Sequence, residues 1–77
     1  MNMAIDYSSL LTGEQKKQIL EQRIAQYAAE GYQHEINKQI AQSLGNEEGV
    51  ASSDAALALL EASIKVHQQE LAALPKE

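Results

Sequence analysis

Two histidines, each with a glutamate within about one helical turn, are the first candidates in this sequence for metal binding or acid–base catalysis. His34 follows Glu30 by four residues in the stretch AAEGYQHE, and His67 precedes Glu70 by three. On a helix these spacings bring imidazole and carboxylate together, as a metal site or an acid–base pair requires. His34 has no second histidine or cysteine within two turns, and the sequence has no HExxH pattern. We therefore expect His34 to be an exposed or rim residue paired with Glu30, and we expect no metal site.

His67 falls instead in an apolar seam of its helix. We expect it to bond a neighbouring polar group, such as Ser53 of a partner helix. A pH-sensitive contact is the alternative, because burial and protonation compete near neutral pH. The sequence has no phosphate-binding glycine loop and no nucleophile with a base at suitable spacing, and a slim hairpin has little room for a pocket of ~300 Å³. We expect no catalytic residue, no cofactor and no enzyme activity.

The elements that hold these residues are predicted to be two long helices. Strong helix formers dominate the composition, and the only proline is Pro75, so the chain is all-α. TGEQ at Thr12 is a capping box, while Gly45 suits a left-handed helix end and Asn46 a new helix cap. A single domain spanning 1–77 is predicted, with an arm lying on the helices (1–11), a helix (12–44), a turn (45–46), a helix (47–74) and a tail (75–77).

Alternatives remain at the start of the second helix, which could begin at residues 52–54. The first helix would be about 50 Å long at 1.5 Å per residue, so the hairpin is elongated. Glu35 and Lys38 are spaced to pair on its surface.

The second helix carries apolar residues on two sides. A seam with alternating steps of three and four residues is typical of a coiled coil. Its members are Val50, Leu57, Leu60, Ile64, Leu71 and Leu74, with Ser53 and His67 filling the two gaps. A thinner stripe on nearly the opposite side comprises Ala55, Leu59, Ala62, Val66 and Ala73. One partner helix cannot cover both sides.

The first helix repeats apolar residues every four positions, so its stripe winds around the helix. The stripe comprises Leu20, Ile24, Ala28, Tyr32, Ile36, Ile40 and Leu44. Either a kink or curved crossing accommodates this winding, or, as we prefer, each half packs on a different neighbour. Gly31 lies near its midpoint, where we expect another helix to cross closely over Ala28 and Gly31, with a slight bend of the helix as the alternative.

These patterns predict a hairpin that belongs to an oligomeric helical bundle or a larger assembly. The residues expected at its interfaces are Tyr27, Gly31, Tyr32, Ile36, Ile40, Leu59, Val66 and His67. The predicted partner is a second copy of the chain or a larger protein assembly, with no small-molecule substrate.

Charge and hydropathy exclude other classes of partner. Six Lys and Arg against eleven Asp and Glu give a net charge of −5, unlike the clustered positive charge of nucleic-acid binders. The opening MNMAIDYSSLL lacks the features of a signal peptide, and no apolar run approaches ~20 residues. We expect a soluble protein, cytoplasmic or virion-associated, that binds neither nucleic acid nor membrane.

The stretch LTGEQKKQILEQRIAQYAAEGYQHE, followed by a second alanine-rich helix, resembles small helical structural and accessory proteins of tailed bacteriophages. That resemblance implies a virion or assembly role without catalysis. A non-enzymatic structural or interaction protein is therefore the expected function. The alternative is an acidic regulatory module that inhibits or adapts a macromolecular partner.

Overall fold

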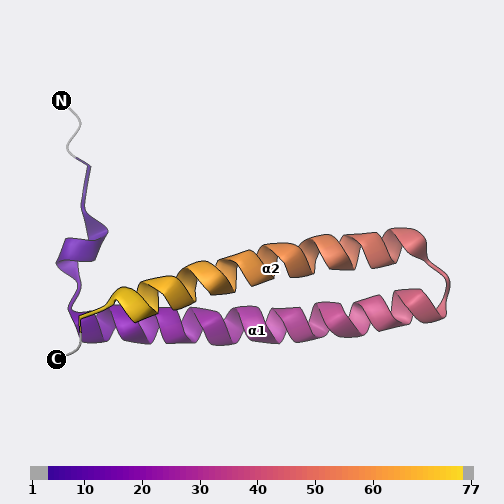
Figure 1. Ribbon diagram of the computed structural model, residues 1–77, viewed down its shortest axis with the longest axis horizontal. Helices are drawn as coiled ribbons and strands as arrows, with labels where there is room; N and C mark the ends of the chain where they lie inside the picture. The colour runs from indigo at the N-terminus through magenta and orange to yellow at the C-terminus, as the bar shows by residue number, and fades with distance from the viewer. Residues whose placement is uncertain (1–3, 76–77) are drawn as a thin grey trace.

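Two antiparallel α-helices form the body of the protein. The computed structural model describes residues 4–75, which hold a short 3₁₀ helix, η1 (Tyr7–Leu10), followed by α1 (Gly13–Ser43) and α2 (Glu47–Ala73). Figure 1 shows the two α-helices side by side, joined by a tight turn. The all-α hairpin predicted from the sequence is confirmed.

Local side-chain chemistry sets the helix ends. The Thr12 hydroxyl accepts from the Gln15 amide at 3.1 Å, and the Thr12 amide donates to Gln15 Oε1 at 2.9 Å, so the predicted capping box starts α1. Gly45 has a φ of 67° after the end of α1, and Asn46 Oδ1 accepts from the Gly49 amide at 3.0 Å. The second helix therefore begins at Glu47 and not near residue 53.

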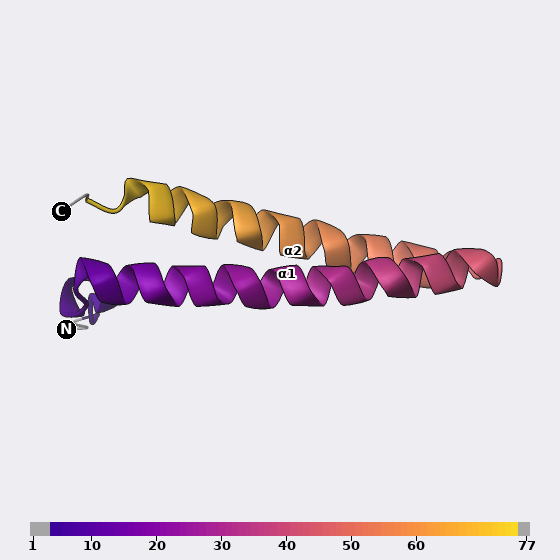
Figure 2. The same ribbon diagram turned by 90° about the horizontal axis from the view of Figure 1, so that it is seen from below.

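The molecule is a slim rod with a projecting arm. Its Cα extents are 51 × 36 × 14 Å and its radius of gyration is 17.2 Å, against about 11.5 Å for a compact chain of this length. At the turn the two helices are separated in Figure 1 but overlap in Figure 2. At the opposite end they overlap in Figure 1 but are separated in Figure 2. The two helices therefore coil around each other, as a seven-residue repeat requires.

The seam of α2 is the predicted one, but the seam of α1 is not the predicted stripe. From Leu20 onward, the residues of α1 that are buried or half-buried recur at alternating steps of four and three: Leu20, Ile24, Tyr27, Gly31, His34, Lys38 and Ala41. Only Leu20 and Ile24 belong to both the seam and the stripe. Continued contact with the regular seam of α2 requires this spacing, so a stripe with steps of four leaves the interface after two turns.

No kink compensates for the winding stripe. The helix α1 is continuous from Gly13 to Ser43 (Figure 1). Beyond Ile24 the stripe turns outward, and Tyr32, Ile36, Ile40 and Leu44 are exposed. The two halves of the stripe thus face different ways, and it stays a prediction that the outward half packs on a different neighbour.

Close packing of the helices is confined to the turn end. Among the described residues only Ala41 and Ser53 are buried, and both are small. Close approach also explains the glycine at position 49, because a Cβ there would lie 3.0 Å from Ala41 Cβ and 2.9 Å from Asn46 Nδ2. No side chain in the described part of the chain is fully buried, so this hairpin has a seam but hardly a core.

The described part of the N-terminal arm, residues 4–11, does not lie on the helices, contrary to expectation, and residues 1–3 of the predicted arm lie outside the described residues. Figure 1 shows η1 standing away from the hairpin axis. Asp6 O accepts from the amide of Ser9 at 3.2 Å and from its hydroxyl at 2.8 Å, which closes a local turn. Ile5, Tyr7 and Leu10 are all exposed. Local hydrogen bonds hold the arm in shape without docking it.

Candidate interaction surfaces

The middle of the seam holds the most elaborate side-chain cluster. The rings of Tyr27 and His67 meet edge to face with centroids 5.1 Å apart. His67 Nδ1 lies 2.7 Å from the Ser63 carbonyl oxygen, the Arg23 guanidinium donates to the Tyr27 hydroxyl, and its Cζ lies 5.5 Å from the centroid of that ring. These contacts join the two helices and orient the imidazole.

His67 therefore occupies the predicted seam position, but its polar neighbour differs from the one expected. The imidazole bonds a carbonyl one turn earlier in its own helix and not Ser53 of another helix. Tyr27 and His67, both predicted interface residues, are half-buried between α1 and α2. They stabilise the hairpin itself.

His34 also lies in the seam, half-buried, and not on an exposed rim as predicted. No ion pair joins it to Glu30 in residues 4–75. That part of the chain also holds no group of three or more His, Cys, Asp or Glu residues placed to bind a metal ion.

Lys38, at another seam position, pairs across the hairpin and not along α1. Its Nζ lies 2.7 Å from Asp54 Oδ1 on α2, so the surface pair expected between Glu35 and Lys38 is replaced. A lysine in a seam favours a partner that offers a carboxylate, and the pair therefore helps to set the register of the helices. A second pair, Lys65 with Glu61 at 3.1 Å, lies within α2.

Gly31 has no close neighbour, so the expected crossing at this glycine does not occur within the hairpin. A Cβ added there would meet nothing within 4 Å. The position lies instead in a groove of about 390 Å³, whose lining includes Tyr27, Tyr32, Leu57 and Ile64. The missing side chain hollows the surface, and within the hairpin the glycine is not required.

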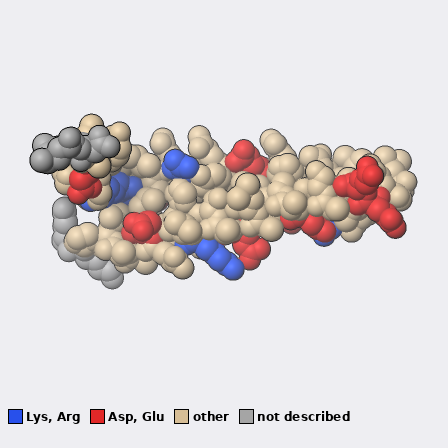
Figure 3. Space-filling view, turned by 90° about the horizontal axis from the view of Figure 1, so that it is seen from above, with Lys and Arg blue, Asp and Glu red and all other residues tan. Residues whose placement is uncertain are grey.

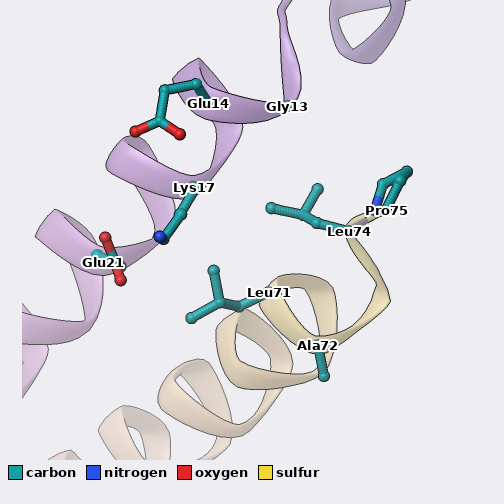
Figure 4. A pocket seen from close by; sticks show the side chains of 8 residues that line it. All are labelled: Gly13, Glu14, Lys17, Glu21, Leu71, Ala72, Leu74 and Pro75. Carbon is teal, nitrogen blue, oxygen red and sulfur yellow. The ribbon is translucent and has the colours of Figure 1, made fainter. Parts of the chain in front are cut away.

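A second groove, of about 530 Å³, opens where the helix ends splay apart. Figure 4 shows Leu71 of α2 and Leu74, which follows this helix, directed toward α1, with Lys17 facing the space between the helices and Pro75 at its rim. The expectation that a slim hairpin has little room for a pocket of ~300 Å³ or more is wrong in volume. Both hollows are open surface grooves, lined by apolar and charged side chains together.

Large apolar side chains cover much of the outside of both helices. Five predicted interface residues are among them: Tyr32, Ile36, Ile40, Leu59 and Val66. Leu59 is 70% exposed and Val66 54%. Ile19 and Leu44 are also exposed, and neither was predicted at an interface. Ile19 belongs to no stripe in the sequence, so its position on the surface is known only from the register of the seam. The outer stripe of α2 is exposed as the sequence indicated.

Charge is distributed unevenly over this surface. Figure 3 shows a cluster of acidic groups at the turn end of the visible face, where Glu47 and Glu48 begin α2, and separate acidic and basic groups among uncharged ones along the rest of the rod. In residues 4–75 this surface therefore combines exposed apolar side chains with two open grooves.

Comparison with known proteins gave no match to a family model, a curated sequence or a solved structure. Within the described residues, neither α-helix contains an apolar stretch long enough to cross a membrane.

Proposed function

We propose that this chain is a non-enzymatic interaction module, a helical hairpin that becomes stable by packing its outer apolar faces against further helices. Those helices belong to other copies of the chain or to a larger assembly. In line with the resemblance to phage proteins, the setting we propose is a virion or its assembly.

The exposed area is the observation that carries this proposal. The chain exposes 6295 Å², whereas a compact protein of its size exposes about 4,600 Å². It thus buries only about half of its unfolded surface, against about 60% for a small stable domain. The missing burial has to come from elsewhere, and the exposed apolar residues of α1 and α2 are placed to supply it.

An acidic regulatory module is the second candidate. Several carboxylates lie beside the grooves, including Glu14, Glu21, Glu35 and Glu61, and could meet a basic partner. Lysines offset this charge, because Lys17 and Lys65 line the same grooves and Lys65 pairs with Glu61. The support for this candidate is correspondingly smaller.

Thermal unfolding at several protein concentrations tests the interaction module. Association coupled to folding makes the midpoint rise with concentration, and a hundredfold concentration range should shift it by several degrees. Circular dichroism between about 1 and 100 µM would measure this shift. A high midpoint that is the same at every concentration would contradict the proposal, because it would mean that the lone hairpin is stable.

A further inference from the structure

The two long sides of the hairpin differ in chemistry. With the seam residues at positions a and d of a seven-residue repeat, the helices of an antiparallel pair place their c and g residues on one side and their b and e residues on the other. The c and g side, here called the aliphatic side, carries Ile19, Ile40, Leu44, Leu59 and Val66, all exposed. The b and e side, here called the acidic side, carries Glu14, Glu21, Glu35, Asp54 and Glu61.

Net charge separates the two sides further. The aliphatic side has two basic and two acidic residues at its g positions, namely Lys16, Arg23, Glu30 and Glu70. Its charges therefore balance, whereas the acidic side is negative overall. Both large grooves open on the acidic side, since their linings include Glu21 and Glu35. Two acidic sides would repel each other, but two aliphatic sides would not.

The aliphatic side has a pattern that repeats along the rod. The ion pair between Lys38 and Asp54 and the ring contact between Tyr27 and His67 fix which residues of α1 and α2 lie at one level. In that register the c positions form four levels about 10 Å apart. From the open end to the turn the levels pair Ile19 with Ala73, Gln26 with Val66, Gln33 with Leu59, and Ile40 with Ser52.

The order of these four levels is complementary to the same order in a second copy that runs in the opposite direction. If a second copy faces the first and runs the other way, with α1 over α1 and α2 over α2, Ile19 meets Ile40 at the outer levels. At the inner levels Val66 meets Leu59, and Gln26 meets Gln33. The large apolar side chains thus meet apolar ones and amides meet amides, while the small side chains of Ala73 and Ser52 meet at the outer levels. A two-fold interface requires such self-complementarity.

We propose that the aliphatic side binds a second copy of this chain, related by a two-fold axis, to form an antiparallel four-helix bundle. This inference rests on the proposed function and specifies its partner and its surface. The side is 51 Å long and about two helix diameters, or ~20 Å, wide. Contact over most of it would bury roughly 800 Å² per chain, the size of a stable protein interface. The acidic sides and their grooves face solvent in this bundle.

Neighbouring substitutions on α2 separate the two sides. Leu59 lies on the aliphatic side and Ala58 on the acidic side, and both are exposed. Leu59→Glu should raise the dimer dissociation constant by about a hundredfold, because each dimer contains the change twice and buries a carboxylate among apolar groups. Ala58→Glu adds the same charge one residue away and should leave the constant within about threefold of wild type. Sedimentation equilibrium measures both.

Single cysteines test the direction of the second copy, since the chain has none of its own. Mixing Gln26→Cys with Gln33→Cys under mild oxidation should give a cross-linked dimer in much higher yield than either variant alone, because a disulfide needs Cα atoms within about 7 Å. Gln18→Cys with Gln39→Cys, at b positions of the acidic side, is the matched control and should not cross-link.

Each outcome has a defined meaning. Loss of association in Leu59→Glu, together with cross-linking only between positions 26 and 33, supports the bundle. If the protein associates but Ala58→Glu is the variant that dissociates it, the assigned side is wrong while the interaction module stands. A dimer without the 26–33 cross-link overturns the antiparallel arrangement. A wild-type chain that stays monomeric yet unfolds at a low midpoint overturns the second copy and leaves another protein as the partner.

Discussion

Two glycines in α-helices show how single residues shape this hairpin. Gly31 has open space where a side chain would be, whereas Gly49 is packed between Ala41 and the capping Asn46. The glycine that suggested a close crossing in the sequence is thus the one with room to spare. Gly49, where the helices do approach closely, also lies in the first turn of α2, and its amide donates to the capping Asn46 side chain.

Alanine at these two positions should have opposite effects. Gly31→Ala should stabilise the fold by up to ~1 kcal/mol, because alanine favours the helix and meets no neighbour. Gly49→Ala should destabilise it by about 1 kcal/mol, since the new methyl displaces the Asn46 cap and crowds Ala41. Chemical denaturation of both variants at one protein concentration measures the difference. Equal shifts in the same direction would contradict the assigned packing.

The side-chain chemistry of the helix ends was predictable from the sequence, and so were the start of α1 and the turn between α1 and α2. Thr12 with Gln15 and Gly45 with Asn46 act through neighbours in sequence, so their roles need no tertiary information. The surroundings of His34 and Lys38 were not predictable from α1 alone. Both occupy seam positions whose contacts depend on the opposing helix, as the ion pair of Lys38 with Asp54 illustrates.

At the scale of elements, α2 determines where α1 is buried. The seam of α2 repeats regularly in steps of three and four, and it was read correctly from the sequence. The large apolar residues of α1 recur every four positions, so they leave the seam after Ile24, and smaller or polar residues such as Gly31 take their places. A pattern within one helix shows which faces are apolar, but the partner helix selects the face that is buried.

A charge in the α2 seam should disrupt the hairpin, whereas the same charge outside should not. Ile64 is half-buried against α1, so Ile64→Asp should cost several kcal/mol and abolish most of the helical signal. Ala62 is exposed on the outside of the same helix, and Ala62→Asp should cost only about 0.7 kcal/mol of helix propensity. Circular dichroism of the two variants compares them. Retention of full helicity in Ile64→Asp would refute the seam.

The arm is the element that the sequence described least well. Its apolar residues predicted docking on the helices, but η1 is held by hydrogen bonds among Asp6, Ser8, Ser9 and Leu11 and stands apart. Ile5, Tyr7 and Leu10 add to the exposed apolar area of the chain. In the proposed assembly they are further candidates for contact with a neighbour.

For the whole molecule, both the shape and the surface indicate that the hairpin lacks a core of its own. A rod of two helices with a radius of gyration of 17.2 Å cannot enclose a core, and even its seam is open along most of its length. Apolar residues that would form the core of a larger bundle are present on the outside. The proposed two-fold bundle places the aliphatic sides of two hairpins together and leaves the acidic sides in water.

The central claim is that this hairpin depends on association with other helices for its stability. Sedimentation equilibrium with circular dichroism on the same samples, from about 1 to 300 µM, tests it most directly. We expect a mass above that of one chain at high concentration, and a parallel loss of mass and helicity on dilution. A single-chain mass with undiminished helicity at every concentration would contradict it.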